Sequence, residues 1–166
     1  MPNTPKYDAS GYEVLTKAVS ELLNQYPGLD GRIVSFEELG DTEGIAFSAD
    51  NGGLVLSEKR YITDHIEEKC QYPFFVVYRT AATRAAQKIN VVSFLETFGK
   101  WICKETVTIG GTQYRLNAYP ELSDGRKITK VTRNNAYGTE PQQNGVQDWL
   151  LPVSVEYTHE YDEGEL

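Results

Sequence analysis

Apolar residues recur at helical spacing in two parts of the chain. The first part begins at Ser10, which forms a capping-box pattern with Glu13, and it ends at Tyr26-Pro27-Gly28. Its apolar positions are Val14, Leu15, Ala18, Val19, Leu22 and Leu23. This spacing predicts an amphipathic helix with one buried face.

The second helical pattern is the strongest periodic signal in the sequence. It extends from about Thr83 to Lys104 and repeats apolar residues every three or four positions. The predicted buried stripe consists of Ala85, Ile89, Val92, Leu95, Phe98 and Ile102. A strand pattern ending in Arg79 and Thr80 comes directly before this helix, so the chain turns from strand to helix at this point.

The other apolar runs have strand length and are rich in β-branched and aromatic residues. They lie at residues 32–37, 45–47, 53–70, 73–78, 106–117, 128–137 and 149–158. The run at 53–70 fits one long strand or two short ones, and 49–53 has the sequence of a tight turn. We therefore expect an α+β fold with a mostly antiparallel, or mixed, sheet of about five or six strands and two main helices packed on it.

The chain length of 166 residues fits one domain with a sizeable core. We expect a flexible leader at residues 1–9, a single domain at 10–158 and an acidic tail at 159–166, with a polar, mobile loop at 138–148. The sequence shows no apolar signal segment and no run long enough to span a membrane. Cys70 and Cys103 have no CxxC spacing and are expected to be reduced structural residues.

Charge is unevenly distributed along the chain. The net charge of −8 argues against a free-standing nucleic-acid-binding protein. Residues 79–133 hold ten basic and four acidic residues, a net charge of +6, so the remainder carries −14. Such a division suits head-to-tail self-association, although a solvated surface with an acidic tail explains the same counts.

Signatures of catalysis are missing from the sequence. The strand-to-helix turn at residues 79–88 has no glycine, so it is neither a phosphate-binding loop nor a dinucleotide fingerprint. There is no G-x-S-x-G motif and no set of ligands at metal spacing. Asp64 and His65 are adjacent, but neighbours on a strand point to opposite faces. We expect no enzymatic activity, no cofactor and no metal.

Arg84 and Lys88 occupy an unfavourable place in the second helix. Cations in the first turns of a helix oppose the macrodipole by about 0.3–1 kcal/mol each. They are either tolerated as solvated surface charges or directed toward an acidic partner.

Four segments follow one another in the chain: QYPFFVVYRT, RAAQKINVVSFLETFGKWI, YPELSDGRKITKVTRNNAY and GVQDWLLPVSVEYTHEY. Their order and spacing resemble the tail-terminator, or minor capsid, proteins of long-tailed bacteriophages, and the similarity covers roughly residues 10–160. The resemblance implies an α+β subunit of a hexameric ring that ends tail-tube polymerisation and forms the head–tail joining surface. It also implies a location at the head-proximal end of the tail in the virion, and in the host cytoplasm during assembly.

The expected partners are further copies of the chain, the tail-tube protein and a head-completion or stopper protein. DNA would pass through such a ring without being read in a sequence-specific way, and no membrane is involved. The candidate cationic interface residues are Arg79, Arg84, Lys88, Arg126, Lys127 and Arg133, and the acidic ones are Glu156, Glu160, Asp162 and Glu163.

Three alternatives stay open at this point. The chain is another head–tail joining protein such as a stopper or adaptor, a small enzyme that uses Asp64, His65 or Cys70, or a binding adaptor outside phage biology with its Tyr-rich strands as the contact face. Convergence of those three side chains in one exposed cleft would favour the enzyme.

Overall fold

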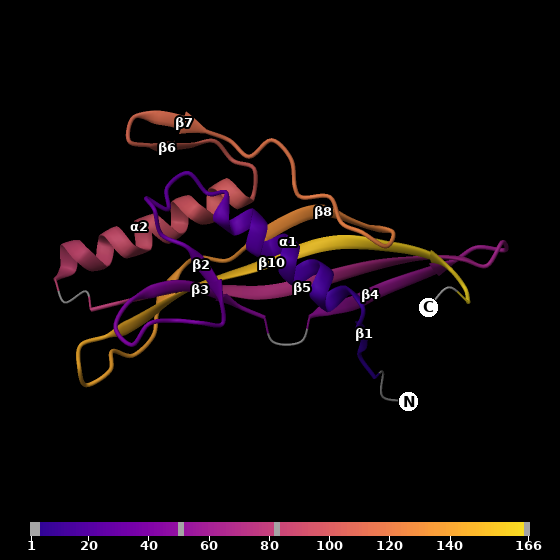
Figure 1. Ribbon diagram of the computed structural model, residues 1–166, viewed down its shortest axis with the longest axis horizontal. Helices are drawn as coiled ribbons and strands as arrows, with labels where there is room; N and C mark the ends of the chain where they lie inside the picture. The colour runs from indigo at the N-terminus through magenta and orange to yellow at the C-terminus, as the bar shows by residue number, and fades with distance from the viewer. Residues whose placement is uncertain (1–3, 50–51, 82–83, 165–166) are drawn as a thin grey trace.

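The computed structural model describes residues 4–49, 52–81 and 84–164 (Figure 1). Two helices lie against one large sheet, with a small separate hairpin beside them. In chain order the elements are β1 (Lys6–Asp8), α1 (Gly11–Asn24), β2 (Val34–Phe36), β3 (Gly44–Ser48), β4 (Gly53–Arg60), β5 (His65–Thr80), α2 (Ala85–Ile102), β6 (Val107–Ile109), β7 (Thr112–Tyr114), β8 (Arg126–Arg133), β9 (Tyr137–Gly138) and β10 (Gln147–Asp162).

The predicted α+β class is confirmed, and the sheet has more strands than expected. The described residues form an eight-stranded sheet with the main order β1-β4-β5-β10-β8, and β6 pairs with β7 separately. All of its pairings are antiparallel except that of β2 with β3. The additional strands are mostly pieces of two or three residues, which are too short to produce an alternating pattern in the sequence.

Two strands of 16 residues, β5 and β10, form the centre of the sheet and pair along their whole length. Pro73 lies in the middle of β5, where the sequence had suggested that a strand begins. Along the side of β5 opposite to β10, β4 pairs up to Gln71 and β3 pairs from Phe75. Pro73 lies between these two partners and pairs with neither. Its lack of an N–H therefore removes no hydrogen bond from the sheet on this side.

Both helices cover the same face of this sheet. Every second residue of β10 from Gln147 to His159 is buried, which marks the covered face. Helix α1 contacts this face through a hydrogen bond of 2.8 Å between the hydroxyls of Thr16 on α1 and Tyr72 on β5. Helix α2 approaches closely at Gly99, where a Cβ atom would lie 3.3 Å from the Leu151 side chain. The core therefore fills the layer between the helices and the sheet.

The predicted capping box of α1 is wrong. Ser10 makes no side-chain cap hydrogen bond, and the Gly11 N–H instead donates to the carboxylate of Asp8 at 3.1 Å. Ser10 Oγ accepts a hydrogen bond from Arg126. A contact from a distant strand has replaced the local motif.

The predicted stripe of α2 is correct only in the second half of the helix. Leu95, Phe98 and Ile102 are buried, whereas Ala85 and Ile89 are exposed. The first turns have little sheet beneath them (Figure 1), so their apolar periodicity finds no surface to cover. The helix ends at Ile102, before the predicted limit of Lys104, and Thr83 lies outside the described residues.

The two expected termini are more ordered than predicted within the described residues. Lys6–Asp8 of the expected leader forms β1, which pairs with β4. The expected acidic tail begins inside β10, where His159 is buried. In the polar loop, β9 pairs with β10 and the Gln142 N–H donates to Val146 O at 2.8 Å. Backbone pairing of polar residues explains these differences, since it leaves no hydrophobic signal in the sequence.

Candidate protein-interaction site

The end of β5 and the start of α2 border the candidate site. Arg84 is the N-cap residue of α2, and its backbone N–H donates to the side-chain oxygen of Gln87 at 3.1 Å. This bond satisfies a backbone group at the helix start without an acidic residue. The Arg84 side chain is exposed and Lys88 is half-buried. The start of α2 is thus stabilised by a glutamine, and the Arg84 side chain is left at the surface.

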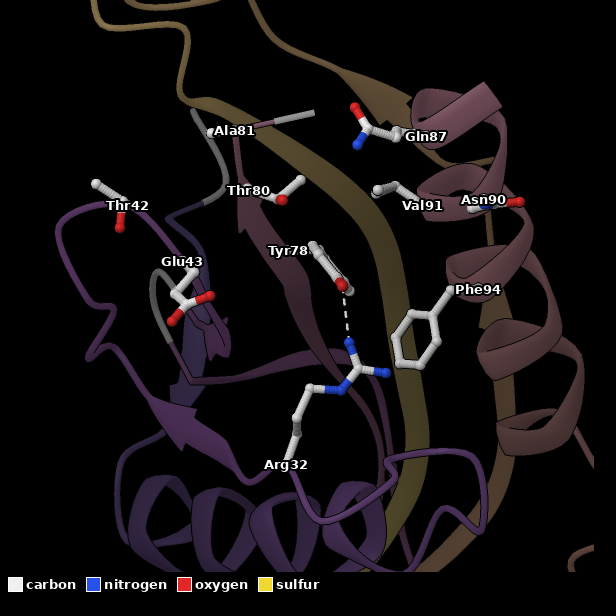
Figure 2. Close-up of a pocket in the computed structure, with 10 residues that line it drawn as sticks. All are labelled: Arg32, Thr42, Glu43, Tyr78, Thr80, Ala81, Gln87, Asn90, Val91 and Phe94. Carbon is white, nitrogen blue, oxygen red and sulfur yellow. Dashed lines mark hydrogen bonds between the residues drawn. The ribbon is translucent and has the colours of Figure 1, made fainter. Parts of the chain in front are cut away.

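A cleft of about 500 Å³ lies between this end of α2 and the end of β5. Figure 2 shows side chains of α2 on one side and residues Thr42 and Glu43 on the other, with Tyr78 between them. An adjoining hollow of about 390 Å³ shares several of the same residues and adds Ile33. The cleft is large enough for a peptide turn or for side chains of another protein.

Arg32 is held in a defined position in this cleft. Its Nη1 donates to the Tyr78 hydroxyl at 2.7 Å, and its Nε donates to Leu29 O at 2.9 Å. The guanidinium carbon lies 4.7 Å from the centre of the Phe94 ring and 5.5 Å from that of Tyr78, so it also makes cation–π contacts. An aromatic surface with a fixed positive charge is suited to a partner that offers an apolar group beside a carboxylate. The sequence analysis missed Arg32, because only the fold brings it to Tyr78 and Phe94.

Arg79 borders the adjoining hollow and is engaged inside the molecule. Its Nε and Nη2 donate to the two carboxylate oxygens of Asp148 at 2.7 and 2.9 Å, and its Nη1 donates to Gly40 O at 3.2 Å. The hydrogen bond to Asp148 raises the pKa of Arg79. Arg79 therefore connects the loop before β3 to the start of β10 and positions one side of the site.

Arg126 and Arg133 also have partners within the chain. Arg126 is buried and forms a two-point ion pair with Asp8, so it is not part of an exposed cationic face. Arg133 Nη1 donates to Glu96 at 2.6 Å. Of the candidate cations, Arg84 and Lys127 are exposed. The positive surface is smaller than the residue counts suggested.

The candidate acidic residues lie along the second half of β10 and just beyond it, at the end of the sheet remote from the cleft. Glu156 is half-buried and faces Lys130 across the strand pair. Asp162 accepts from His65 Nδ1 at 3.0 Å, and Glu163 pairs with Arg60 at 3.0 Å. Glu160 is exposed. Lys127 on β8 faces Thr158, which lies between Glu156 and Glu160 on β10. No ion pair joins a cationic candidate to an acidic one among the described residues.

The densest polar cluster is buried and surrounds Asp8. Burial opposes ionisation of this carboxyl, but hydrogen bonds from Arg126 and Tyr157 outweigh that effect and hold the pKa of Asp8 below its usual value. Burial and the bond to Asp8 raise the pKa of Tyr157. Beside them His159 Nδ1 lies 3.3 Å from Glu68 Oε1, and Lys6 Nζ lies 2.7 Å from Glu68 Oε2. The cluster joins β1 to three strands and has the character of a structural ion network.

The residues of the enzyme alternative do not converge. Asp64 is exposed in the turn before β5, and His65 at the start of β5 is bonded to Asp162. Cys70 is buried, and burial raises the pKa of its thiol to about 12. Within the described ranges, no group of three His, Cys, Asp or Glu side chains is arranged to hold a metal ion.

Neither helix of the described chain is long and apolar enough to cross a membrane.

Comparisons with known proteins do not assign the chain to a family. No protein-family model matches the sequence, and a search of curated proteins gives no significant match.

Proposed function

We propose that the protein is a structural component of a phage virion that assembles as a ring on the end of the tail tube. There it ends tube polymerisation and forms the surface that joins the tail to the head. Its partners are copies of itself, the tail-tube protein and a head-completion or stopper protein. The proposal rests on the resemblance of the sequence motifs and is supported by the shape of the sheet.

The observation that carries the proposal is that the sheet has two different open edges. On one side β8 is the last strand, and on the other side residues 56–60 of β4 extend beyond β1. No strand among the described residues pairs with either edge. Open edges can accept a strand from a neighbour, and two different edges favour a heterologous contact, which forms a ring when its rotation closes.

Electron microscopy of phage particles that lack this protein tests the proposal. A missing terminator is expected to give overlong or ragged tails, because nothing stops tube growth. Tails of normal length without filled heads would instead support the stopper alternative. Particles with normal tails and filled heads would contradict both functions.

Purified protein gives a second, independent test. Size-exclusion chromatography and native mass spectrometry of the protein, alone and with tail-tube protein added, are expected to show a closed ring in at least one condition. A monomer in both conditions, with no binding to tubes, would contradict the proposal.

A further inference from the structure

The hairpin that joins β4 to β5 carries an exposed apolar tip. Ile62 is 104% exposed, and Tyr61 beside it is 40% exposed. The turn has a fixed shape, because the Tyr61 N–H donates to His65 O at 2.9 Å and the Asp64 N–H donates to Tyr61 O at 3.1 Å. In Figure 1 this hairpin forms one extreme of the molecule. The Ile62 side chain is therefore presented to solvent by an ordered arm.

The hairpin tip and the cleft lie at opposite ends of the same strand. The tip directly precedes His65, the first residue of β5, and the cleft surrounds Tyr78 and Thr80 at its other end. A strand of 16 residues is about 50 Å long. The tip of one molecule consequently cannot reach its own cleft, and only a second copy can bring the two together.

The two surfaces match in chemistry. The cleft offers the apolar side chains of Val91 and Phe94 and the guanidinium of Arg32, with Glu43 on the wall opposite α2 (Figure 2). The tip offers Ile62 and the carboxylate of Asp64. Neither Arg32 nor Asp64 forms an ion pair within the described part of the chain. Four other arginines do form such pairs; they are Arg60, Arg79, Arg126 and Arg133.

We propose that residues 61–64 of one copy dock in the cleft of the next copy, with Ile62 against Phe94 and Asp64 facing Arg32. The contact is heterologous, so each copy uses its tip on one neighbour and its cleft on the other. This inference rests on the proposed function and deepens it, because it names one contact between neighbours in the ring in addition to the open sheet edges.

A charge exchange tests the contact between Arg32 and Asp64. The variants Arg32→Glu and Asp64→Arg are each expected to weaken self-association by about tenfold or more, because like charges then face each other. The double variant, which carries both changes in every copy, is expected to regain association close to that of the wild type. Analytical ultracentrifugation over a concentration series measures each effect, and circular dichroism verifies the fold.

The rescue separates an interface from a structural role. Arg32 also bonds to Tyr78 and Leu29, so Arg32→Glu alone can disturb the cleft locally. A change at Asp64, at the far end of β5, repairs such damage only through contact between copies. Tyr114→Ser, at an exposed site of the β6–β7 hairpin, is a matched control that is expected to associate normally. Failure of the double variant to recover would overturn the inference.

Disulfide trapping gives a direct measurement of the same contact. An equal mixture of Ile62→Cys and Asn90→Cys proteins is expected to form a covalent dimer under mild oxidation, because Asn90 lines the cleft. Mixtures of Ile62→Cys with Tyr114→Cys are expected to remain largely monomeric on a non-reducing gel. Equal cross-linking in both mixtures, or none in either, would overturn the docking.

The results also distinguish the inference from the function on which it rests. Rings without the Ile62–Asn90 cross-link would refute the docking and leave the ring proposal standing. The opposite outcome is also informative. If the cross-link forms, but particles that lack the protein have normal tails and filled heads, the docking is supported and the role in tails is refuted.

Discussion

Asp8 accepts hydrogen bonds from three segments that are far apart in the chain. The donors are Gly11 at the start of α1, Arg126 on β8 and the Tyr157 hydroxyl on β10, at distances of 2.6–3.1 Å. Burial of a carboxylate is unfavourable unless it is paired with a cation and hydrogen-bonded, and the Asp8 carboxylate meets both conditions. The residue that the sequence placed in a flexible leader therefore anchors the N-terminal segment to the sheet.

Replacement of Asp8 by Asn is expected to destabilise the protein by about 3–5 kcal/mol, because it removes the buried counter-charge of the Arg126 guanidinium. The other carboxylate near Arg126, that of Asp124, is exposed and lies 3.9 Å away. Urea unfolding followed by circular dichroism measures the change. The matched control is Glu13→Gln, which removes an exposed pair with Lys17 and is expected to leave the midpoint unchanged. Equal midpoints for both variants would contradict the anchoring role.

The pH dependence of stability follows from the direction of the Asp8 shift. The pKa of Asp8 in the fold lies below its usual value of 3.8, so its stabilising effect is complete above that pH. The effect is lost as the pH falls through the lower folded value. The free energy of unfolding of the wild type is therefore expected to fall more steeply below about pH 4 than that of Asp8→Asn. Parallel profiles between pH 5 and pH 2 would contradict this expectation.

At the scale of elements, the two halves of α2 have different surroundings. Tyr26 contacts three aromatic side chains in the second half of α2. The centre of its ring lies 5.9 Å from that of Phe94, 4.5 Å from that of Phe98 and 5.3 Å from that of Trp101. The first turns face solvent on one side and the cleft on the other. The apolar residues of α2 follow one continuous periodic pattern. Those in the second half of the helix lie in the core, and those in the first half lie at the surface.

Two substitutions on α2 measure this division. Leu95→Ala is expected to lower the free energy of unfolding by about 2–5 kcal/mol, because it opens a cavity in the core. Ile89→Ala, at a site that is 67% exposed, is expected to change it by less than about 0.5 kcal/mol. Chemical denaturation measures both. A similar loss for Ile89→Ala would mean that the first turns are packed after all.

At the scale of the whole molecule, internal ion pairs reduce the charge division seen in the sequence. Arg79 and Arg126 are paired with Asp148 and Asp8, which lie outside the basic stretch of residues 79–133. Of the cations singled out in the sequence, Arg84 remains exposed near the cleft and Lys88 is half-buried beside it. Arg32, which lines the cleft, is exposed as well. The acidic candidates gather toward the opposite end of the sheet, where Lys6, Arg60 and Lys127 also lie.

Reversal of Arg84 and Lys88 to Glu is expected to weaken ring formation or docking to the tail tube, because it reverses two positive charges at the start of α2 that would face an acidic partner. The difference in association between this variant and the wild type is expected to become smaller at high salt, since exposed charges are screened. Native mass spectrometry and a tube-binding assay provide the measurement. Lys17→Glu, at an exposed position of α1, is the control. No difference from the control would show that both cations are merely solvated.

The sequence by itself determined the α+β class, the two helices and most of the longer strands, because hydrophobic periodicity over many residues reports directly on burial. It also identified the β5–α2 turn, which borders the cleft. It did not locate Arg32, the pairing of Asp8 with Arg126, or the exposure of Ile89.

Only the tertiary structure decided those points. Which hydrogen bonds and ion pairs form, and how far a helix extends beyond its sheet, depends on contacts between segments that are distant in sequence. A local sequence pattern does not show these contacts. The short strands β1, β2 and β9 are likewise defined by their partners, since two or three residues acquire strand structure only when a neighbouring backbone completes their hydrogen bonds.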